Sequence, residues 1–414
     1  MIQHYVRQGL ALELWVLLAL SAASLFWFDL LPVVVFTAAI FWLVRLVGFG
    51  YFTLRTPPDL AIALLCVIVL ATVFITPIPE KTFPQIWRAL SGIALFYALV
   101  NWVSTYTTIR YLFFGIILLG VFLALFAPFS VEWAVDKLTF IPEILYNNFA
   151  VLVQDYVHPN VLGGILVLLL PFPISYLIFG WKRIKRFERL LVLAALLLIF
   201  LMLVLTRSRG AWMAAFASIF LLLMLRDRRS WIMILLAGIV VLIGVYQFGI
   251  ARILDAVLYS NTIGGWDGRL EIWSRAIHLI RDFPFSGIGM GTFPELAEKF
   301  YAYDIYAPEN IPHAHNLFMQ VSLDLGIPGL VAWLSIFLSI IFISWQVYMA
   351  GRKMNDYLFT AMGAALISCQ ISLIVHGLMD SVTWGMVRPA PLVWIIWGIG
   401  AAVFSKINKL QVKT

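Results

Sequence analysis

Long apolar segments follow one another along almost the whole chain, and a segment of this length crosses a lipid bilayer as a helix. We expect about twelve such spans, at residues 11–28, 30–48, 60–77, 86–103, 109–127, 160–180, 187–205, 209–225, 231–249, 327–350, 357–377 and 388–405. Their longest runs are aliphatic on every side, without the alternation that barrel strands require. The sequence therefore predicts an all-α polytopic membrane protein, with residues 1–414 in a single integral domain.

The composition excludes a soluble fold and gives the chain an orientation. Of the 414 residues, 63% are hydrophobic and 12% are charged, which is more apolar surface than a water-soluble domain can bury. Most of the 28 lysines and arginines lie in short connections on one predicted side. The positive-inside rule makes that side cytoplasmic, together with both termini. The net charge of +7 is then mainly a topology signal, and we expect membrane lipids but no nucleic acid as partners.

Two long connections lie on the opposite, extracytoplasmic side, over residues 128–159 and 250–326, the second between spans 9 and 10. The 250–326 loop has more acidic than basic residues, so an anion site there must use a few placed arginines. We expect short helices in this loop. One is predicted over 268–282, beginning after Asp267 and lying along the membrane interface. Its predicted apolar stripe comprises Leu270, Trp273, Ile277 and Ile280.

Two glycine-containing segments of this loop are interpreted as turns. Gly287-Ile288-Gly289-Met290-Gly291 lacks the surrounding strands of a nucleotide site, so we interpret it as a tight turn that permits close backbone approach. Gly326-Ile327-Pro328-Gly329 is expected to break a short helix before the next span.

The loop closes with His313-Ala314-His315-Asn316, directly before a short apolar run. A histidine at a helix start near the membrane surface can be neutral and can accept a proton from a substrate hydroxyl, and Asn316 could orient it or hold a sugar. Alternatively, the histidines hydrogen-bond the backbone where the loop re-enters the membrane. A metal site is a third interpretation. Two histidines at this spacing, with no carboxylate at ligand spacing, make a poor zinc site, and we expect no metal.

Thr206-Arg207-Ser208-Arg209-Gly210 joins two aliphatic spans so tightly that both guanidiniums must lie at the outer membrane boundary. The positive-inside rule disfavours arginine there. One explanation is a lipid pyrophosphate, because a guanidinium grips phosphate oxygens in a fixed geometry and keeps its charge. The other explanation is snorkelling of both side chains to lipid headgroups.

Five further polar residues lie near this predicted outer boundary, each with a structural alternative. Arg88 and Arg388 are outward-facing cations at span ends, which either bind an anion or pair with a nearby acid. His376 and Asp380 bracket the end of one span, as a pair inside the bundle or as part of a site. Asn160 starts another span, as a helix-start residue or a substrate contact.

Together these residues resemble the O-antigen ligase and polymerase superfamily of bacterial membrane glycosyltransferases. The shared order begins with the arginine turn at 207–210 and one hairpin. A long outer loop follows, with Arg269 and Trp273 in a helix, and it closes with His315 and Asn316 before a Gly-Pro turn. The resemblance covers residues 160–350 well. It implies a GT-C-like helical fold in the bacterial inner membrane, with the active site at the periplasmic face.

The resemblance implies an enzyme without cofactor or metal that takes an O-antigen-like glycan from undecaprenyl diphosphate and passes it to a hydroxyl acceptor. His315 would be the general base, and Arg207 and Arg209 would grip the donor diphosphate, with Arg88 as a further candidate. Attack opposite the leaving group would invert the anomeric carbon. The supporting or acceptor-side residues would be His313, Asn316, Arg269, Asn160, His376, Asp380 and Arg388.

Two alternatives stay open beside the ligase interpretation. A ligase of this superfamily passes the glycan to a sugar of the lipid A core, in lipopolysaccharide biosynthesis, whereas a polymerase passes it to another carrier-linked repeat unit. The sequence does not distinguish them, and we place the ligase first. An anion or sugar transporter is the alternative from another class. The chain has no internal repeat or matched pair of broken helices, and its polar residues gather at one face, which speaks against transport.

Overall fold

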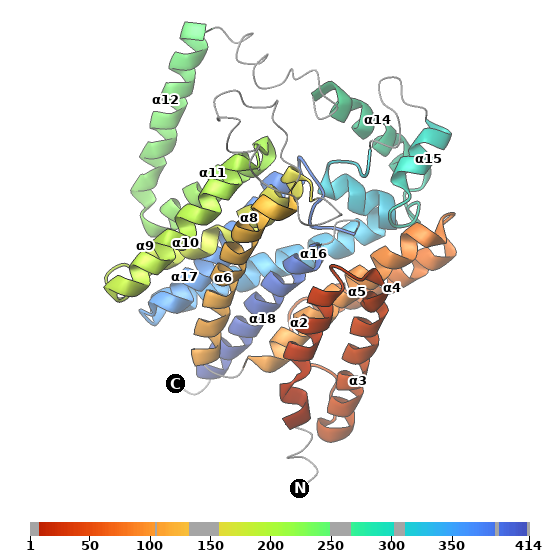
Figure 1. Ribbon diagram of the computed structural model, residues 1–414, viewed down its shortest axis with the longest axis horizontal. Coiled ribbons are helices and arrows are strands. Elements are labelled where there is room, and N and C mark those ends of the chain that lie inside the picture. The colour runs from red at the N-terminus through yellow and green to blue at the C-terminus, as the bar shows by residue number, and fades with distance from the viewer. Residues whose placement is uncertain are drawn as a thin grey trace.

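The computed structural model describes residues 8–103, 106–131, 157–248, 266–301, 311–385 and 389–411. The regular structure of these residues is helical, apart from one isolated bridge between Val131 and Val157. Nine of the described helices are long and apolar enough to cross a membrane, and the helices run through the molecule as a bundle (Figure 1). The predicted class, an all-helical polytopic membrane protein, is confirmed.

The helices follow the predicted spans closely. The nine of membrane length are α3 Leu31–Phe49, α5 Pro79–Trp102, α6 Tyr106–Ser130, α8 Pro159–Leu169 with α9 Pro171–Gly180, α10 Arg186–Leu205, α11 Arg209–Arg226, α16 Leu317–Lys353, α17 Tyr357–Gly377 and α18 Pro391–Gln411. The remaining predicted spans contain α2 Glu13–Ala23, α4 Asp59–Ala71 and α12 Trp231–Phe248, and short 3₁₀ turns occur at Phe28–Leu30, Thr72–Phe74 and Arg228–Ser230. The count of twelve spans and the GT-C-like topology remain predictions.

Burial separates inner helices from outer ones. The apolar segments of α5, of the α8–α9 pair and of α17 are 78%, 83% and 78% buried, whereas those of α3 and α10 are 22% and 28% buried. Exposed apolar side chains on the outer helices are expected where lipid replaces a protein neighbour. α17 packs along α9, α11 and α16, and α18 packs along α5. The turn that follows α17 is therefore held by an inner helix of the bundle.

The contact between α16 and α17 is close because a glycine lines it. A Cβ added to Gly363 would lie 2.3 Å from the backbone nitrogen of Tyr348, which no side chain tolerates. Small residues at such positions let membrane helices approach backbone to backbone. This contact holds the start of α17 against the end of α16, and at the other end a Cβ added to Gly377 would lie 3.1 Å from the Leu317 side chain.

α16 is broken near its start, as the Gly-Pro turn predicted. Gly326 has φ 71° and ψ 179°, outside the helical region. The Gly287–Gly291 turn packs onto this break, where the Ile288 N–H donates to the Leu323 carbonyl at 2.7 Å. Gly287 has φ 66°, and a Cβ there would lie 2.6 Å from the same carbonyl oxygen. The interpretation of this segment as a turn for close backbone approach is confirmed.

Two helices of the outer loop, α14 Trp266–Asp282 and α15 Phe293–Phe300, cover the end of the bundle where α16 begins (Figure 1). The predicted helix over 268–282 is confirmed, although it already includes Asp267, which was expected to precede it. Its apolar stripe along the membrane interface stays a prediction, and the face that packs on protein is a different one. Leu270 and Ile277 are 47% and 40% exposed. The buried face is instead made by Ile272, Ala276 and Leu279, with Trp273 and Ile280 partly buried. α14 packs against α15 and the histidine loop, and this contact selects a face rotated from the one that apolar spacing favoured.

Candidate active site

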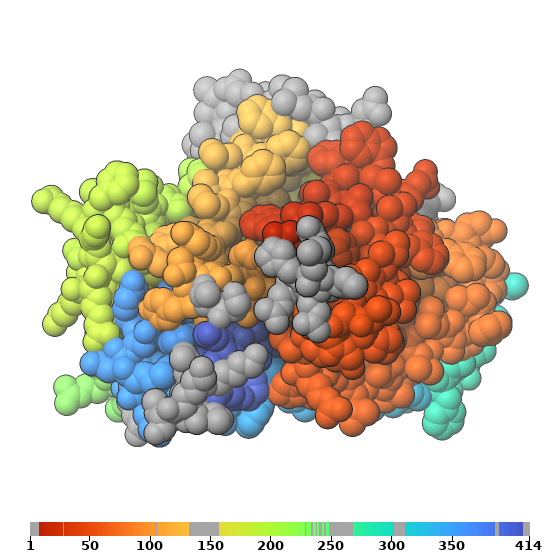
Figure 2. All heavy atoms as spheres, turned by 90° about the horizontal axis from the view of Figure 1, so that it is seen from below, coloured from red at the N-terminus to blue at the C-terminus, as the bar shows by residue number. Residues whose placement is uncertain are grey.

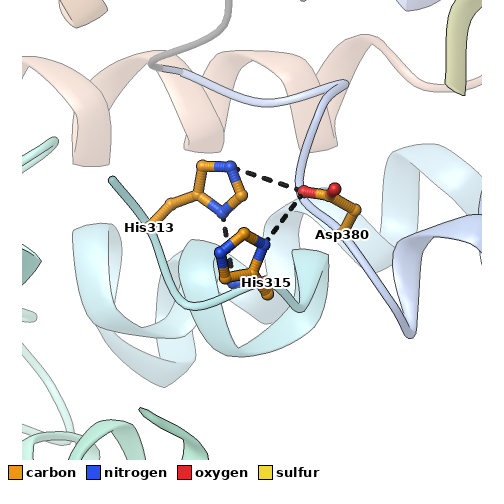
Figure 3. Close-up of side chains that lie close together, drawn as sticks. All are labelled: His313, His315 and Asp380. Atoms are coloured by element: carbon orange, nitrogen blue, oxygen red, sulfur yellow. Dashed lines mark hydrogen bonds and ion pairs between the residues drawn. The ribbon is translucent and has the colours of Figure 1, made fainter. Parts of the chain in front are cut away.

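Two histidines and one aspartate form a cluster at the α14 end of the bundle (Figure 3). His313 and His315 belong to the loop before α16, and Asp380 belongs to the turn after α17. His313 Nε2 lies 3.4 Å and His315 Nδ1 3.6 Å from the same oxygen, Asp380 Oδ1. The two rings meet edge to face, with centroids 4.3 Å apart. The carboxylate thus faces one nitrogen of each imidazole.

The backbone assigns the tautomer of His313. Its Nδ1 accepts the His315 backbone N–H at 3.1 Å, so a neutral ring carries its proton on Nε2, the nitrogen that faces Asp380. Burial lowers the pKa of His313 to about 3, and the neighbouring His315 adds to this effect. The ring is therefore neutral at neutral pH. His313 acts as a fixed N–H donor toward the carboxylate rather than as a proton acceptor.

His315 is the more accessible of the two rings. Its side chain is 24% exposed, although Nδ1 itself is buried. The exposure therefore belongs to the remaining side-chain atoms, away from Asp380. If the proton of this ring is on Nδ1, opposite the carboxylate, Nε2 has a free lone pair. Such an arrangement suits proton acceptance from a hydroxyl.

Asp380 is a deeply buried carboxylate, 5% exposed. Burial alone would raise its pKa, but the imidazoles of His313 and His315 outweigh burial and hold the pKa of Asp380 below its usual range. The Ser381 backbone N–H also donates to Oδ1 at 2.8 Å. A buried anion persists when such partners compensate its lost hydration. The cluster therefore holds one negative charge at a fixed position between two loops.

Hydrogen bonds from two helices fix the histidine loop at Ala314. Its N–H donates to Gln320 Oε1 of α16 at 2.9 Å, and its carbonyl accepts from Trp273 Nε1 of α14 at 3.1 Å. Gln320 Nε2 in turn donates to the buried Asp324 at 2.9 Å. Both backbone groups between the two histidines are therefore bonded to side chains, and the direction of the rings is set by the scaffold.

Asn316 has a structural position at the start of α16. Its Oδ1 accepts the N–H groups of Phe318 and Met319 at 3.0 Å and 3.1 Å, which makes it the N-cap of this helix. Its Nδ2 donates to the Leu378 carbonyl at 3.3 Å. Asn316 thus holds the histidine loop against the turn that carries Asp380.

Backbone strain occurs in the two loops that the sequence singled out. Arg207 and His315 have φ of 54° and 48°, in the left-handed region. In the described part of the chain, the one other non-glycine residue with positive φ is Asn355, a residue type that adopts this conformation readily. Strained residues persist where surrounding contacts enforce them, and they gather at functional sites. Both side chains are therefore directed by a backbone that would not adopt this shape alone.

The arginine turn between α10 and α11 is tightly packed. Arg207 is buried, 7% exposed, whereas Arg209 is exposed. Ser208 caps α11 by accepting the Ala211 N–H at 3.4 Å. α8 lies directly against the turn, since a Cβ added to its Gly163 would be 3.0 Å from Ser208 Cβ. The predicted tight connection is confirmed, and one of its arginines is directed into the protein.

The turn after α17 joins the arginines to the histidine cluster. A Cβ added to Gly210 would lie 3.0 Å from Met379 Cβ, so the arginine turn contacts the segment before Asp380. Arg269 of α14 donates from Nη1 to the Met379 carbonyl oxygen. Burial lowers the pKa of Arg269, while Asp380 opposes this shift and Arg209 adds to it. Two arginines and the carboxylate therefore share one neighbourhood, from three elements far apart in the sequence.

Arg88 and Arg388 are the remaining cations that the sequence singled out. Arg88 is buried on α5 and donates to Gln85 Oε1 at 2.8 Å and to the Gly385 carbonyl. It thereby ties α5 to the segment that follows Asp380. Arg388 lies outside the described residues.

His376 and Asn160 lie on the two helices that enclose the arginine turn. His376 is buried at the end of α17, and its Nε2 has no hydrogen-bond partner among the described residues. A Cβ added to Gly164 of α8 would be 2.7 Å from the His376 ring, so α8 packs directly on this histidine. Asn160 is half-buried in the first turn of α8, and its N–H donates to His158 Nδ1 at 3.1 Å. The helix start predicted at Asn160 is confirmed, with His158 as the cap.

Sequence reasoning missed two residues that position the cluster. Gln320 was not predicted, and Trp273 was assigned to an apolar stripe rather than to a hydrogen bond. A signal for Gln320 was present: it lies four residues after Asn316 and four before Asp324, which places three polar side chains on one face of an otherwise apolar helix. For Trp273 the sequence carried no such signal.

The same cluster has the donor set of a metal site. One ligand atom from each of His313, His315 and Asp380 lies within 4.8 Å of the others. The sequence argument against a metal depended on the absence of a carboxylate near the histidines, and the fold supplies one from the turn after α17. Two imidazoles and a carboxylate suit zinc, so the residues fit such an ion as well as a proton acceptor.

Comparison with known families gives one match. The family model described as O-antigen ligase matches residues 193–334. This segment contains the arginine turn, α14 with Arg269, and the histidine loop, and it ends before Asp380. A search of curated proteins finds no match.

Proposed function

We propose that the protein, whose residues 193–334 match the O-antigen ligase family model, transfers a glycan from undecaprenyl diphosphate to a hydroxyl acceptor, with His315 as general base. The observation that carries the proposal is the geometry of His315. One ring nitrogen faces a buried carboxylate at 3.6 Å, while the side chain as a whole is 24% exposed. The family domain supports a membrane enzyme of the ligase or polymerase type.

Asp380 is proposed as the positioning residue for the base. A carboxylate opposite Nδ1 favours the tautomer with its proton there and stabilises the imidazolium that forms at Nε2. His313 Nε2 lies 3.4 Å from the same oxygen and the ring remains neutral, so it limits the rotation of the carboxylate. His315 is thereby poised to take one proton without a change of rotamer.

The donor diphosphate is assigned to Arg207, Arg209 and Arg269. The leaving group departs with negative charge, and guanidiniums fixed near it stabilise that charge in the transition state. Arg209 is exposed and Arg269 half-buried, near the turn that carries Asp380. The buried Arg207 has its direction set by a strained backbone, which suits a contact with a single geometry.

The reaction then proceeds in one displacement. The acceptor hydroxyl oxygen forms a bond to the anomeric carbon as the bond from that carbon to the phosphate oxygen breaks. The hydroxyl proton passes to His315 Nε2, and the bonding electrons leave with undecaprenyl diphosphate. Because this is a good leaving group, no acid is required to protonate it. Attack from the opposite side inverts the anomeric configuration.

We also propose an acceptor for the glycan and the face of the membrane on which the reaction occurs. We place the site on the periplasmic face of a bacterial inner membrane, with both termini in the cytoplasm, since the basic connections favour this orientation. A lipid A-core sugar is the proposed acceptor, and a second carrier-linked repeat unit is the polymerase alternative.

Reconstitution with lipid-linked glycan tests the function directly. Purified protein in liposomes is incubated with undecaprenyl-diphosphate-linked glycan and, separately, with a lipid A-core acceptor or a second carrier-linked unit. We expect a glycosylated acceptor and released undecaprenyl diphosphate, and the productive acceptor distinguishes ligase from polymerase. Absence of product with both acceptors, from folded protein, contradicts the proposal.

His315→Ala should lower the transfer rate by about 10²–10⁴, the usual contribution of a general base. The matched control is His278→Ala, which removes an exposed imidazole from α14 outside the cluster and should leave the rate within about twofold. Equal rates in both variants would remove the base assignment.

A metal-assisted version is the second candidate, favoured by the spacing of His313, His315 and Asp380. In it, an ion at these ligands would activate the acceptor hydroxyl. Elemental analysis of the purified protein, with transfer measured before and after chelation, separates the two versions. Stoichiometric zinc together with loss of transfer on chelation would favour the ion, and full transfer after chelation would favour the free base.

A further inference from the structure

A large cavity lies at the end of the bundle opposite the histidine cluster. Its volume is ≈ 990 Å³, and it opens between the end of α9, the first half of α10, the end of α11 and the α16–α17 connection. α17 separates it from Asp380 by the length of a helix of 21 residues, on the order of 30 Å. Figure 2 looks onto this end, where α10 and α11 (yellow-green) lie beside the start of α17 (blue). The cavity is therefore no part of the candidate active site.

The interior of this cavity is apolar and its mouth is basic. Leucine, isoleucine and phenylalanine side chains line the interior, among them Leu177, Phe179, Leu193, Leu196 and Leu223. The charged residues that line it are Lys182, Arg183, Arg226, Arg352 and Asp356. The four cations are exposed. An apolar interior below exposed cations matches an amphiphile with an anionic head.

The single acid at the mouth does not neutralise these cations. Asp356 Oδ1 accepts the N–H groups of Leu358 and Phe359 at 2.8 Å and 3.0 Å, so it caps α17. In the part of the chain that the structure describes, none of the four cations forms an ion pair with a carboxylate. The mouth therefore carries positive charge in excess.

Two of the cations are held in place by aromatic rings. Arg226 lies over Phe179 at 5.9 Å, and Arg352 lies over Tyr348 at 6.0 Å. These two arginines also line a second cavity, of ≈ 790 Å³, on their other side. Contacts with ring faces orient a guanidinium without removing its charge. Arg226 and Arg352 thus form a positioned pair between two hollows.

We propose that this pair binds the phosphate of an anionic phospholipid whose acyl chains occupy the apolar cavity. The position at the helix ends fits a lipid of the nearby leaflet, the cytoplasmic one in the predicted orientation. Basic pockets between transmembrane helices recognise anionic headgroups by charge and forked hydrogen bonding. The proposal does not depend on the transfer reaction.

Lipid retention measured on the full-length protein tests the site. Purified protein is delipidated in mild detergent and incubated with phosphatidylglycerol or phosphatidylethanolamine of the same chains, and bound lipid is counted by native mass spectrometry. We expect preferential retention of phosphatidylglycerol. The Arg226→Ala/Arg352→Ala variant should reduce that retention by about tenfold. Equal retention of the two lipids by the unmodified protein overturns the proposal.

A control variant with the same loss of charge distinguishes lipid binding at this cavity from general attraction of anionic lipid to a positive surface. Arg186→Ala/Arg229→Ala removes two exposed arginines from the same end but from outside the cavity, and it should retain phosphatidylglycerol at the unmodified level. An equal loss in this control overturns the proposal.

Leu196→Trp narrows the apolar interior of the cavity while it keeps every charge, and it should also weaken retention. Unchanged retention in this folded variant overturns the proposal. The variant also keeps the proposal testable if the arginine variant fails to fold. Preferential displacement of phosphatidylglycerol by undecaprenyl phosphate would assign the cavity to the polyprenyl carrier and would also overturn it.

Discussion

The two ends of the bundle hold their charges in opposite ways. At the histidine end, Asp380, His313 and Arg207 are 5%, 7% and 7% exposed, and one nitrogen of each imidazole ring lies 3.4–3.6 Å from the carboxylate. At the other end, Arg226 and Arg352 are exposed and lie on aromatic rings. The same kinds of side chain are fixed inside the protein at one end and presented at its surface at the other.

This difference indicates different tasks. Buried and mutually bonded charges keep one geometry, which stabilises a transition state without reorganisation. Exposed arginines on a lipid-facing rim adapt to headgroups and tolerate motion. The comparison predicts that removal of one charge at the histidine end impairs a chemical step, whereas removal of one at the basic end changes lipid association.

After the loss of His315, the largest effect is expected at the arginine turn. Arg207→Ala and Arg209→Ala should each lower the transfer rate by about 10²–10³, as for other groups that stabilise a departing charge. Arg209→Lys should recover part of the loss, since the charge remains but the forked geometry is gone. Donor titrations in liposomes measure this.

Arg186→Ala, at the basic end, is the control for charge loss and should leave donor use unchanged. If Arg207→Ala and Arg209→Ala also give donor titrations identical to the unmodified protein, Arg209 only snorkels to headgroups and the buried Arg207 has a structural role. The two ends would then not differ in the way that their burial indicates.

A smaller effect is expected at Asp380. Asp380→Asn keeps the size of the side chain but removes the negative charge that faces His315 Nδ1, so the rate constant kcat should fall by about 10² while the donor KM stays within about twofold. Asp324→Asn is the matched control, because Asp324 is an equally buried carboxylate at the same end. It accepts from Trp384 Nε1 at 2.8 Å and from the Gly291 N–H at 3.2 Å, so its loss should lower thermal stability more than kcat. Equal effects of both variants on kcat would assign Asp380 a purely structural role.

Much of this arrangement could be predicted from the sequence, because its signals are local. Apolar segments of membrane length predicted the helices. Counting these segments placed the arginine turn and the histidine loop at the same end of the bundle. Strain at Arg207 and His315 was not visible, since φ is set by contacts from other helices. Both residues were nonetheless singled out, because each stands among polar residues next to an apolar segment.

The remaining features depend on contacts between distant segments. Two transmembrane helices, α16 and α17, separate Asp380 from the histidines in the sequence, so no spacing rule joins them. The expectation of no metal therefore left Asp380 out. Asn316 was interpreted as a possible sugar ligand, although an asparagine before an apolar helix is a common N-cap. α14 has apolar residues on more than one face, and only its neighbours decide that Ile272 and Ala276 are buried while Leu270 is exposed.

The smallest effect is expected in the pH dependence of stability, and it also distinguishes the two ends. His313 has a pKa of about 3 in the folded protein, below the value of about 6.5 for a free histidine. Its neutral form is therefore favoured by folding. The stability that it contributes is complete above pH 6.5 and is lost as the pH falls from about 6.5 toward 3. At pH 5 the loss from this one ring is on the order of 2 kcal/mol.

The thermal unfolding midpoint of the unmodified protein should consequently fall more steeply between pH 7 and pH 5 than that of His313→Gln, whose amide does not titrate. Arg226→Ala provides the contrast, because no titrating group is removed, and its midpoint should stay parallel to that of the unmodified protein across this range. A His313→Gln curve that is also parallel would mean that the pKa of His313 is the same in the folded and the unfolded protein. Protonation of His313 near pH 6.5 would then place a second proton on Nδ1, which could no longer accept the His315 N–H.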